Sequence, residues 1–355
     1  MGANTTKLLK NKLAEPNTVS KSIADTETMQ STAASSSSDN QSNVTKSDEN
    51  KSVKTILVNA LEAKQWNPNN PNSWEPDMRE YHSLPESDYM LPSDGDEQNR
   101  LQLQHHIFYT VFEGNIVCPA AKELVKKSGT KILDVGCADG FWLQSVKNEN
   151  PLPEYHGVDI SEDLVNGVSV ENDGVNLTFG NVLTGLPYKD NTFDYVHQRM
   201  LVLGIPKEKF PDALRELIRV TKPGGWIELL ESDMVFYKGG SYTKTLGTAF
   251  FNALDRRGLD CYAATNLPWY VWKVNEHVTK QETKTVHIPF GWGSTVGDMS
   301  GRNGNTAMLG LEDWMHKAMG ISREEYRELV QNCYDEWVEM RTFGQSRTIY
   351  FQVKK

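Results

Sequence analysis

The sequence predicts an α/β protein built on a seven-stranded, mostly parallel sheet, with an N-terminal arm before it and a helical insertion before the last strands. Three observations support this fold class. From residue 131 onward, short apolar segments alternate with helical segments, which is typical of a parallel sheet covered on both faces. A glycine-containing turn joins the first apolar segment to a helix. The chain from about Asn17 to Lys54 contains almost no large apolar side chains.

The N-terminal region is predicted to have two parts. Residues 1–54 form a disordered tail, because Ser, Thr, Asn, Asp, Gln and Lys dominate from Asn17 to Lys54 and cannot bury enough apolar surface to offset the entropy of ordering. Residues 55–95 form an irregular arm, rich in Pro, Asn and Trp, that could wrap over the folded domain.

Residues 96–355 are predicted to form the main domain, which opens with a helix from Asp96 to Phe112. Seven apolar segments are the expected strands: Lys131 to Val135, Glu154 to Asp159, Asn176 to Phe179, Thr192 to His197, Gly225 to Leu230, Thr283 to Pro289 and Arg347 to Val353. An amphipathic helix from Glu208 to Val220 should end in a tight turn over residues 222–225. An aromatic-rich helical insertion, about residues 236–281, has the position of an active-site cover.

Composition excludes several function classes. Lys and Arg total 37 against 47 for Asp and Glu, and the net charge of -10 argues against direct binding to nucleic acid. The four cysteines are scattered without metal-ligand spacing, so no metal site is expected, and a reducing compartment suits them. No apolar run approaches the roughly 20 residues of a membrane span. We therefore expect a soluble protein of the cytoplasm or nucleus.

The first six residues, Met1 to Thr6, match the MGxxx[ST] pattern of N-myristoylation and are followed by three nearby lysines. Acylation of Gly2 together with these basic residues would allow reversible contact with a membrane. The alternative is an ordinary flexible tail, which we favour because the pattern is short and common.

The strongest chemical signal is the turn after the first strand, where Asp134 precedes Gly136, Cys137, Ala138 and Gly140. Glycines in such a turn let the backbone approach a ligand closely. The spacing differs from the GxGxxG of dinucleotide enzymes, and the carboxylate would repel a pyrophosphate. It suits a cofactor that carries a sulfonium and an ammonium group, namely S-adenosylmethionine. The alternative is an ordinary turn between a strand and a helix.

Two further strand ends contain polar side chains that fit the same cofactor. Asp159, followed by Ile160, lies about 20 residues beyond the glycine turn, where a carboxylate accepts hydrogen bonds from both ribose hydroxyls. Asn181, followed by Val182, could bond the edge of adenine, although a plain turn residue is nearly as probable an interpretation.

The end of the fourth strand and the first helix supply candidates for the rest of the ligand. His197, Gln198 and Arg199 could meet the methionine carboxylate or the substrate, or Arg199 could be a surface charge. Gln104 or His105 could close over the cofactor, as Tyr89 and His106 could, although a helix histidine is more often packed or exposed. Several aromatic side chains could line a substrate pocket or simply form core: Phe250, Phe251, Tyr262, Trp269, Trp272 and Trp292.

In this order and spacing, these motifs resemble the class I S-adenosylmethionine-dependent methyltransferases over about residues 95 to 235. The run from Tyr89 to His106, with Gly140 to Trp142 and Val196 to Leu201, resembles fungal LaeA-like methyltransferases more narrowly. The resemblance implies a Rossmann-like sheet of order 3-2-1-4-5-7-6 with an antiparallel last strand. It also implies cofactor contacts at Asp134, Gly136, Gly140, Asp159 and Asn181. Ala138 and Asn181 depart from the usual glycine and acid.

Three functions follow as hypotheses: a methyltransferase acting on a small molecule, a LaeA-like regulator working with a protein partner, and a cofactor-binding scaffold without turnover. The aromatic insertion favours the first. Methyl transfer from a sulfonium needs alignment and exclusion of water more than dedicated catalytic groups. No catalytic residue is identifiable from the sequence, because the nucleophilic atom of the acceptor is unknown.

Overall fold

The structure, a computed structural model, describes residues 91–92, 95–161 and 174–354. The predicted tail, the myristoylation pattern and most of the arm, including Tyr89, lie outside the described residues. In the part of the chain that is described, no helix is long and apolar enough to cross a bilayer.

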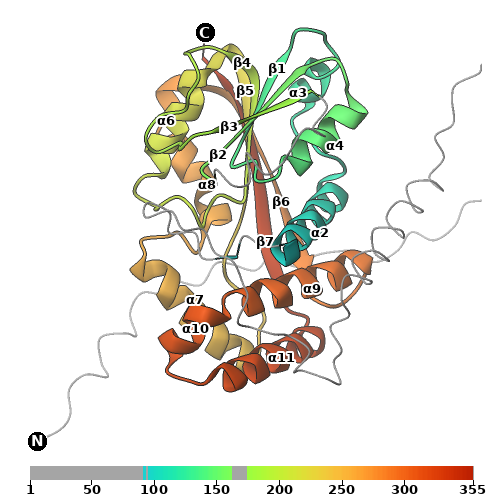
Figure 1. The fold of residues 1–355 in the computed structure, drawn as a ribbon, viewed down its shortest axis with the longest axis vertical. Helices are drawn as coiled ribbons and strands as arrows, with labels where there is room; N and C mark the ends of the chain where they lie inside the picture. Colours follow the sequence, from blue (N-terminus) through green and yellow to red (C-terminus); the bar gives the residue numbers. More distant parts are fainter. Residues whose placement is uncertain (1–90, 93–94, 162–173, 355) are drawn as a thin grey trace, which may run out of the picture. The chain divides into compact units, whose positions relative to one another are not determined.

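A seven-stranded sheet forms the centre of the described fold (Figure 1). Its strands are β1 (Lys131–Val135), β2 (Glu154–Asp159), β3 (Val175–Phe179), β4 (Phe193–Arg199), β5 (Thr221–Ser232), β6 (Val278–Pro289) and β7 (Phe343–Val353). Their order is β3-β2-β1-β4-β5-β7-β6. Strands β1 to β5 pair in parallel, and β7 runs antiparallel to β5 and β6. The Rossmann-like α/β fold and the predicted strand order are therefore confirmed.

One predicted turn is wrong. Helix α6 (Phe210–Val220) is followed at once by β5, whose first residue, Thr221, pairs with Phe193. The register then shifts before Tyr195 pairs with Trp226, so the glycines at 224 and 225 lie within an irregular strand instead of a separate turn. Gly224 supplies the positive φ of 82° that this irregularity needs.

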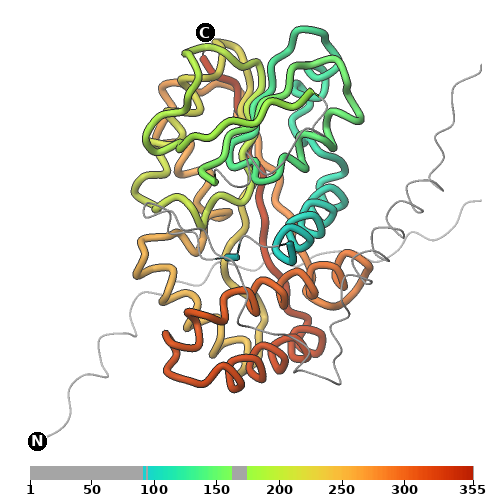
Figure 2. The backbone as a smooth tube through the Cα atoms, in the orientation of Figure 1, coloured from blue at the N-terminus to red at the C-terminus, as the bar shows by residue number. Residues whose placement is uncertain are grey.

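Helices cover both faces of the sheet. On one face, α6 and α8 (Ala263–Trp272) pack on β5, and α8 also packs on β7. Helices α3 (Pro119–Leu124) and α4 (Phe141–Glu149) cover the other face through Ala121, Trp142 and Leu143. The backbone trace shows the two pairs on opposite sides of the twisted strands (Figure 2). Apolar side chains on the sheet-facing sides of these helices thus form the main core.

A second core lies beyond the carboxyl ends of the strands. It is formed mainly by α7 (Ser241–Arg256), α9 (Thr295–Gly310), α10 (Glu312–Met319) and α11 (Arg323–Met340). We call these four helices the cover. Helix α2 (Gly95–Phe112) runs alongside α9 (Figure 1).

The insertion contains α7, α8 and the short 3-10 helix η3 (Asn275–His277), as its helical character predicted. Only α7 belongs to the cover, whereas α8 packs on the sheet. Along the chain, helices α9 to α11 follow β6 and precede β7. No helix was predicted for this region. The Ser322 and Glu325 side chains form a capping box at the start of α11.

Candidate active site

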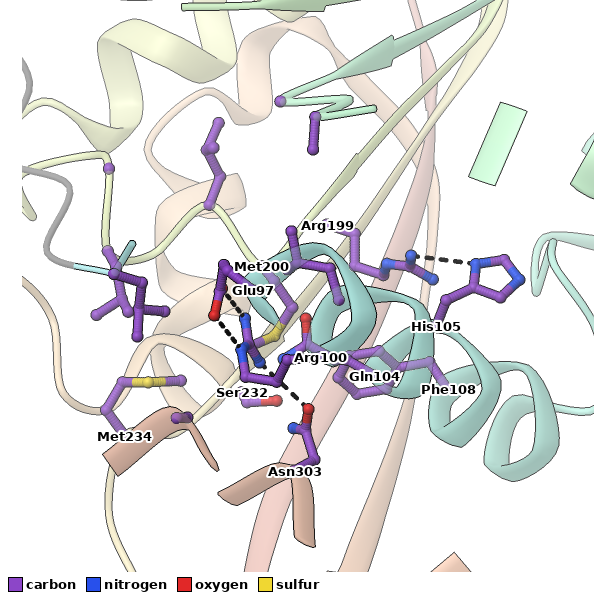
Figure 3. A pocket seen from close by; sticks show the side chains of 18 of the residues that line it. Glu97, Arg100, Gln104, His105, Phe108, Arg199, Met200, Ser232, Met234 and Asn303 are labelled. Atoms are coloured by element: carbon purple, nitrogen blue, oxygen red, sulfur yellow. Dashed lines mark hydrogen bonds and ion pairs between the residues drawn. The ribbon is translucent and has the colours of Figure 1, made fainter. Parts of the chain in front are cut away.

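A cavity of about 350 Å³ opens at the carboxyl ends of the parallel strands and extends toward α2 and α9 (Figure 3). Nine of the residues proposed for cofactor binding line it: Gln104, Asp134, Gly136, Cys137, Ala138, Asp159, Ile160, Asn181 and Val182. Gly140 and His197 do not line it. This edge of an open α/β sheet is where ligands ordinarily bind.

The turn after β1 brings the backbone against the cavity. Gly136 has a φ of 73°, and a Cβ atom there would lie 2.7 Å from a methyl carbon of Leu201. Gly140, with a φ of 76°, is instead the N-cap of α4. Ala138 has a φ of 48°, a left-handed conformation that costs an alanine more than the glycine usual at this position. The two glycines therefore have different tasks, one at the cavity wall and one at the helix start.

Asp159 ends β2 with its carboxylate directed toward this turn. One oxygen accepts a hydrogen bond from the Ala138 amide at 2.9 Å, and the other accepts from the Ser161 amide at 2.9 Å. These bonds orient the carboxylate, and a carboxylate oxygen can accept more than one hydrogen bond. A ribose with two adjacent hydroxyls fits this arrangement.

Asn181, at the end of β3, acts as a turn residue. Its Oδ1 atom accepts a hydrogen bond from the Leu183 amide at 2.8 Å. The NH₂ group of the Asn181 side chain takes no part in this bond and can donate to a ligand. The alternative turn role considered for this residue is confirmed, and a contact with adenine stays a prediction.

His197 does not line the cavity itself, but it contacts two residues that do, Asp134 and Trp142. The His197 ring lies 2.7 Å from Asp134, from Nδ1 to Oδ1, on the neighbouring strand. It stacks on Trp142 at a centroid distance of 3.8 Å and an interplanar angle of 3°. The geometry therefore does not favour the predicted direct contact of His197 with the cofactor. His197 instead orients Asp134, and Asp134 lines the cavity.

Arg199 is the last residue of β4 and lines the same cavity. Its guanidinium Nη2 lies 3.3 Å from His105 Nδ1 on α2, and its Cζ lies 5.6 Å from the centre of the Phe108 ring (Figure 3). Arginine carries only donors, so His105 Nδ1 is the acceptor. Loss of hydration on burial lowers the pKa of Arg199 to about 10.

His105 is neutral in the folded protein at ordinary pH, because burial and the neighbouring Arg199 charge lower its pKa to about 2. Its side chain is only 2% exposed and meets the Phe141 ring edge-on at 4.9 Å. Of the two neighbouring histidines, His105 lines the cavity and His106 does not.

This burial predicts a loss of stability in acid. Below pH 6.5 the unfolded chain protonates His105 and the folded chain does not, so the free energy of unfolding falls by at most about 1.4 kcal/mol per pH unit from this group. Urea unfolding at pH 7.5 and 5.5 should show a smaller pH effect in a His105→Asn variant than in the wild type. Equal pH effects in the two proteins would contradict this assignment.

A polar network not found from the sequence links α2 to α9 across the cavity. Arg100 donates two hydrogen bonds to the Glu97 carboxylate, at 2.8 and 2.6 Å, and a third to Asn303 Oδ1 at 3.2 Å (Figure 3). Glu97 and Arg100 are 3% and 5% exposed. The three-residue spacing of Glu97 and Arg100 on a helix is one from which an ion pair can be predicted. Asn303 lies 203 residues from Arg100, so no sequence pattern could predict its contact.

The loop after β4 is held by a buried acid. Glu231 accepts hydrogen bonds from the amides of Leu201 and Val202, at 3.0 and 3.2 Å. Burial raises the pKa of Glu231 to about 8. Because Leu201 packs beside Gly136, this carboxyl group supports one wall of the cavity without lining it.

Most of the aromatic side chains proposed for a substrate pocket lie elsewhere. Phe250 lines the cavity, but Phe251 and Trp292 do not. Tyr262, Trp269 and Trp272 are 43%, 51% and 59% exposed. The prediction is wrong for these because α8 places its outer side in solvent while its Leu267 and Val271 side pack on the sheet. Phe236 and Phe290, which were not proposed, line the cavity.

No metal site is seen among the described residues, where no group of three or more His, Cys, Asp and Glu side chains could hold an ion. The cavity has carboxylates near the strand ends, an arginine beside them, and an apolar chamber under the cover.

Comparison with known proteins gives a consistent result. The family described as "Methyltransferase domain" matches residues 132–225. The chain is 29% identical to the N-methyltransferase sirN of Leptosphaeria maculans over 260 residues, which covers 70% of this chain and 84% of sirN. The chain is also 32% identical to the secondary metabolism regulator laeA of Coprinopsis cinerea over 157 residues. This second alignment covers only 42% of the chain and 37% of laeA.

Among solved structures, phosphoethanolamine N-methyltransferase 2 of Haemonchus contortus aligns with a TM-score of 0.41 and 17% sequence identity. That alignment covers 72% of this chain and 57% of the nematode protein.

Proposed function

The chain belongs to the class I methyltransferases and is LaeA-like, and from this premise we propose that it transfers a methyl group from S-adenosylmethionine to a small-molecule acceptor. One observation carries the proposal: a single cavity runs from the glycine turn of β1 to an apolar chamber under the cover. Such a cavity can hold a cofactor and a small acceptor end to end.

The residues at the strand ends fit this cofactor in shape and charge. Asp159 would accept the two ribose hydroxyls, and Asp134 would attract the ammonium group of the methionine end. Gly136 leaves room for the ligand beside Leu201. A pyrophosphate-bearing dinucleotide fits poorly, because Asp134 places a carboxylate at the glycine turn, where the pyrophosphate of a dinucleotide would lie.

The cofactor supplies a methyl group that is already activated by its sulfonium. The chain's contribution is then to align the acceptor and to exclude water. Apolar side chains under the cover exclude water from the chamber. They are Leu91, Phe236, Phe250, Phe290, Met308 and Leu311. No side chain in the cavity needs to act as a base if the acceptor atom is a neutral amine nitrogen, whose lone pair attacks the methyl group directly and whose proton leaves after transfer.

The acceptor we propose is an apolar molecule with a nitrogen nucleophile. The relative sirN is an N-methyltransferase, and the chain covers 84% of its length. In the chamber, Glu97 is paired with Arg100 and neutralises its charge. A chamber whose acid is already paired suits an uncharged acceptor better than the cationic side chain of a lysine or arginine.

Transfer of a labelled methyl group tests the function. The protein should methylate one or more apolar nitrogen compounds from a fungal metabolite extract, and an Asp159→Ala variant should not. Label found only in protein bands, or in no acceptor at all, would contradict the proposal.

The pairing of His197 with Asp134 gives a second test. His197→Leu should weaken S-adenosylhomocysteine binding about 10-fold, the worth of one charge-assisted hydrogen bond. His197→Asn should recover part of the affinity, because its amide can still donate to Asp134. Binding of 5′-methylthioadenosine, which lacks the amino-acid end, should stay as in the wild type. Loss of affinity for both ligands would show a general structural defect instead.

A regulatory role is the second candidate, since the chain is similar to laeA over 157 residues. It would require a protein partner. Recovery of the native protein from cell extract in a stable complex, together with absence of methyl transfer to metabolites, would favour this role over the first.

A further inference from the structure

Helix α9 lines the cavity with one face, and most of that face is apolar. The α9 residues that line the cavity recur every three or four positions, as one side of a helix does: Ser300, Asn303, Gly304, Ala307 and Met308. The Ser300 hydroxyl donates to the carbonyl oxygen of Val296, within α9 itself. Within the described part of the chain, this leaves the Asn303 side chain as the hydrogen-bond donor that α9 offers to the cavity.

The Asn303 amide is held in one orientation. Arg100 Nη1 lies 3.2 Å from Asn303 Oδ1, and because an arginine can only donate hydrogen bonds, the atom of the amide that faces it is the oxygen (Figure 3). The Nδ2 group of Asn303 makes no hydrogen bond with any described residue. Asn303 therefore presents an NH₂ donor whose direction is fixed before a ligand binds.

This fixed orientation distinguishes Asn303 from Gln104, another amide side chain that lines the cavity. The Gln104 side chain makes no hydrogen bond with the residues that the structure describes, so either end of its amide can face a ligand. Ordering such a side chain on binding costs entropy. The Asn303 amide loses less freedom, and it therefore discriminates better between ligands that do and do not accept a hydrogen bond.

The charges beside Asn303 favour a neutral partner. Glu97 accepts two hydrogen bonds from Arg100, at 2.8 and 2.6 Å, and neutralises it. The amide is thus not part of a positively charged site, which would favour a carboxylate. A neutral oxygen on an otherwise apolar molecule fits the remaining apolar face of α9, and a carbonyl oxygen is such an acceptor.

We propose that Asn303 determines acceptor specificity: its NH₂ group donates a hydrogen bond to a carbonyl oxygen of the methyl acceptor, which is an apolar nitrogen compound with a carbonyl group. This inference rests on the proposed function and deepens it, because it names the group by which the acceptor is recognised. Asn303 belongs to the cover, whereas Asp134 and Asp159 follow strand ends, so the bond acts in the acceptor half of the cavity. Holding the acceptor at its carbonyl limits which nitrogen can approach the methyl group.

The test uses two neutral aromatic amines that differ in one group. They are para-aminobenzophenone, which has a carbonyl, and para-benzylaniline, which has a methylene in its place. Each is titrated calorimetrically into the full chain saturated with S-adenosylhomocysteine. The wild type should bind the ketone about 3- to 10-fold more tightly, the worth of a hydrogen bond between neutral groups.

Asn303→Asp should lose this preference. Aspartate has the size of asparagine and can still accept from Arg100, so the link between α2 and α9 is kept, but the ionised side chain has no donor. Asn303→Leu, which removes both the donor and the link, should also bind the two amines alike. Both variants should bind S-adenosylhomocysteine as the wild type does, which shows that the cavity is intact.

Asn305→Leu is the matched control. Asn305 lies on the same helix, does not line the cavity and makes no side-chain hydrogen bond with the described residues, so this variant should keep the preference for the ketone. A wild type that binds the two amines alike, or neither of them, would overturn the inference. So would an Asn303→Asp protein that still prefers the ketone, or an Asn305→Leu protein that loses the preference. Failure of the wild type to bind S-adenosylhomocysteine would instead overturn the proposed function.

Discussion

Replacing Asp159 with alanine is expected to lower the affinity for S-adenosylmethionine at least about 100-fold, because two hydrogen bonds from ribose hydroxyls to a carboxylate are worth about 3 kcal/mol or more together. The alanine also leaves the amides of Ala138 and Ser161 without this acceptor, so the turn after β1 loses one of its hydrogen bonds to β2. Calorimetric titration measures the affinity directly.

Two variants make this result specific. Asp159→Asn keeps a side-chain oxygen for one of the two amides but removes the charge, so its affinity should lie between those of the wild type and the alanine variant. Asp190→Ala removes an exposed acid that pairs with Arg219, and it should bind as the wild type does. An Asp159→Ala protein with normal affinity would show that the ribose lies elsewhere.

The second large effect is expected in the cover. Trp337 on α11 is fully buried and packs against Phe236 and Phe290, with ring centroids 5.1 and 5.3 Å away. Trp337→Ala should lower the free energy of unfolding by about 3–5 kcal/mol, the usual cost of deleting a buried tryptophan side chain. Urea unfolding of the two proteins at one pH measures the difference.

Trp337→Phe is the matched control. The indole Nε1 of Trp337 has no hydrogen-bond partner among the described residues, so phenylalanine gives up little besides volume and should cost less than about 1.5 kcal/mol. Because Phe236 and Phe290 also line the cavity, Trp337→Ala should weaken acceptor binding more than cofactor binding. Equal stability of the alanine and phenylalanine variants would contradict the packing described.

The sheet was predictable because its strands are short, apolar and separated by helices of regular period. The bounds of β1 and β2 agree with the prediction, and β3 and β4 differ by one or two residues. Strands β5, β6 and β7 are longer than predicted. Their added residues are largely polar or partly exposed, so apolar patterning does not detect them, and pairing with neighbouring strands extends them.

Helix α9 of the cover was missed for a physical reason. It contains Gly297, Gly301, Gly304 and Gly310, and glycine disfavours a helix by about 1 kcal/mol relative to alanine. Tertiary packing overrides this propensity. A Cβ atom at Gly301 would lie 2.6 Å from the backbone nitrogen of Gly291, so the helix approaches the preceding chain closely only because the side chain is absent.

The cofactor half of the site was readable because its residues follow strand ends directly. Asp134, Gly136 and Asp159 each have a place that the strand pattern fixes. Arg199 and His105 were each proposed as ligand-facing residues, but their contact was not predictable, since it joins residues 94 positions apart. Likewise, the sequence could not show that His197 turns toward Asp134 and away from the cavity, which depends on the Trp142 ring.

Titration of S-adenosylmethionine, S-adenosylhomocysteine and NAD into the wild-type protein tests the central claim most directly. The geometry of Asp134, Gly136 and Asp159 predicts saturable binding of the first two ligands and none of NAD. Binding of NAD, or no binding of either adenosyl ligand by correctly folded protein, would contradict the proposal that this cavity is a methyltransferase cofactor site.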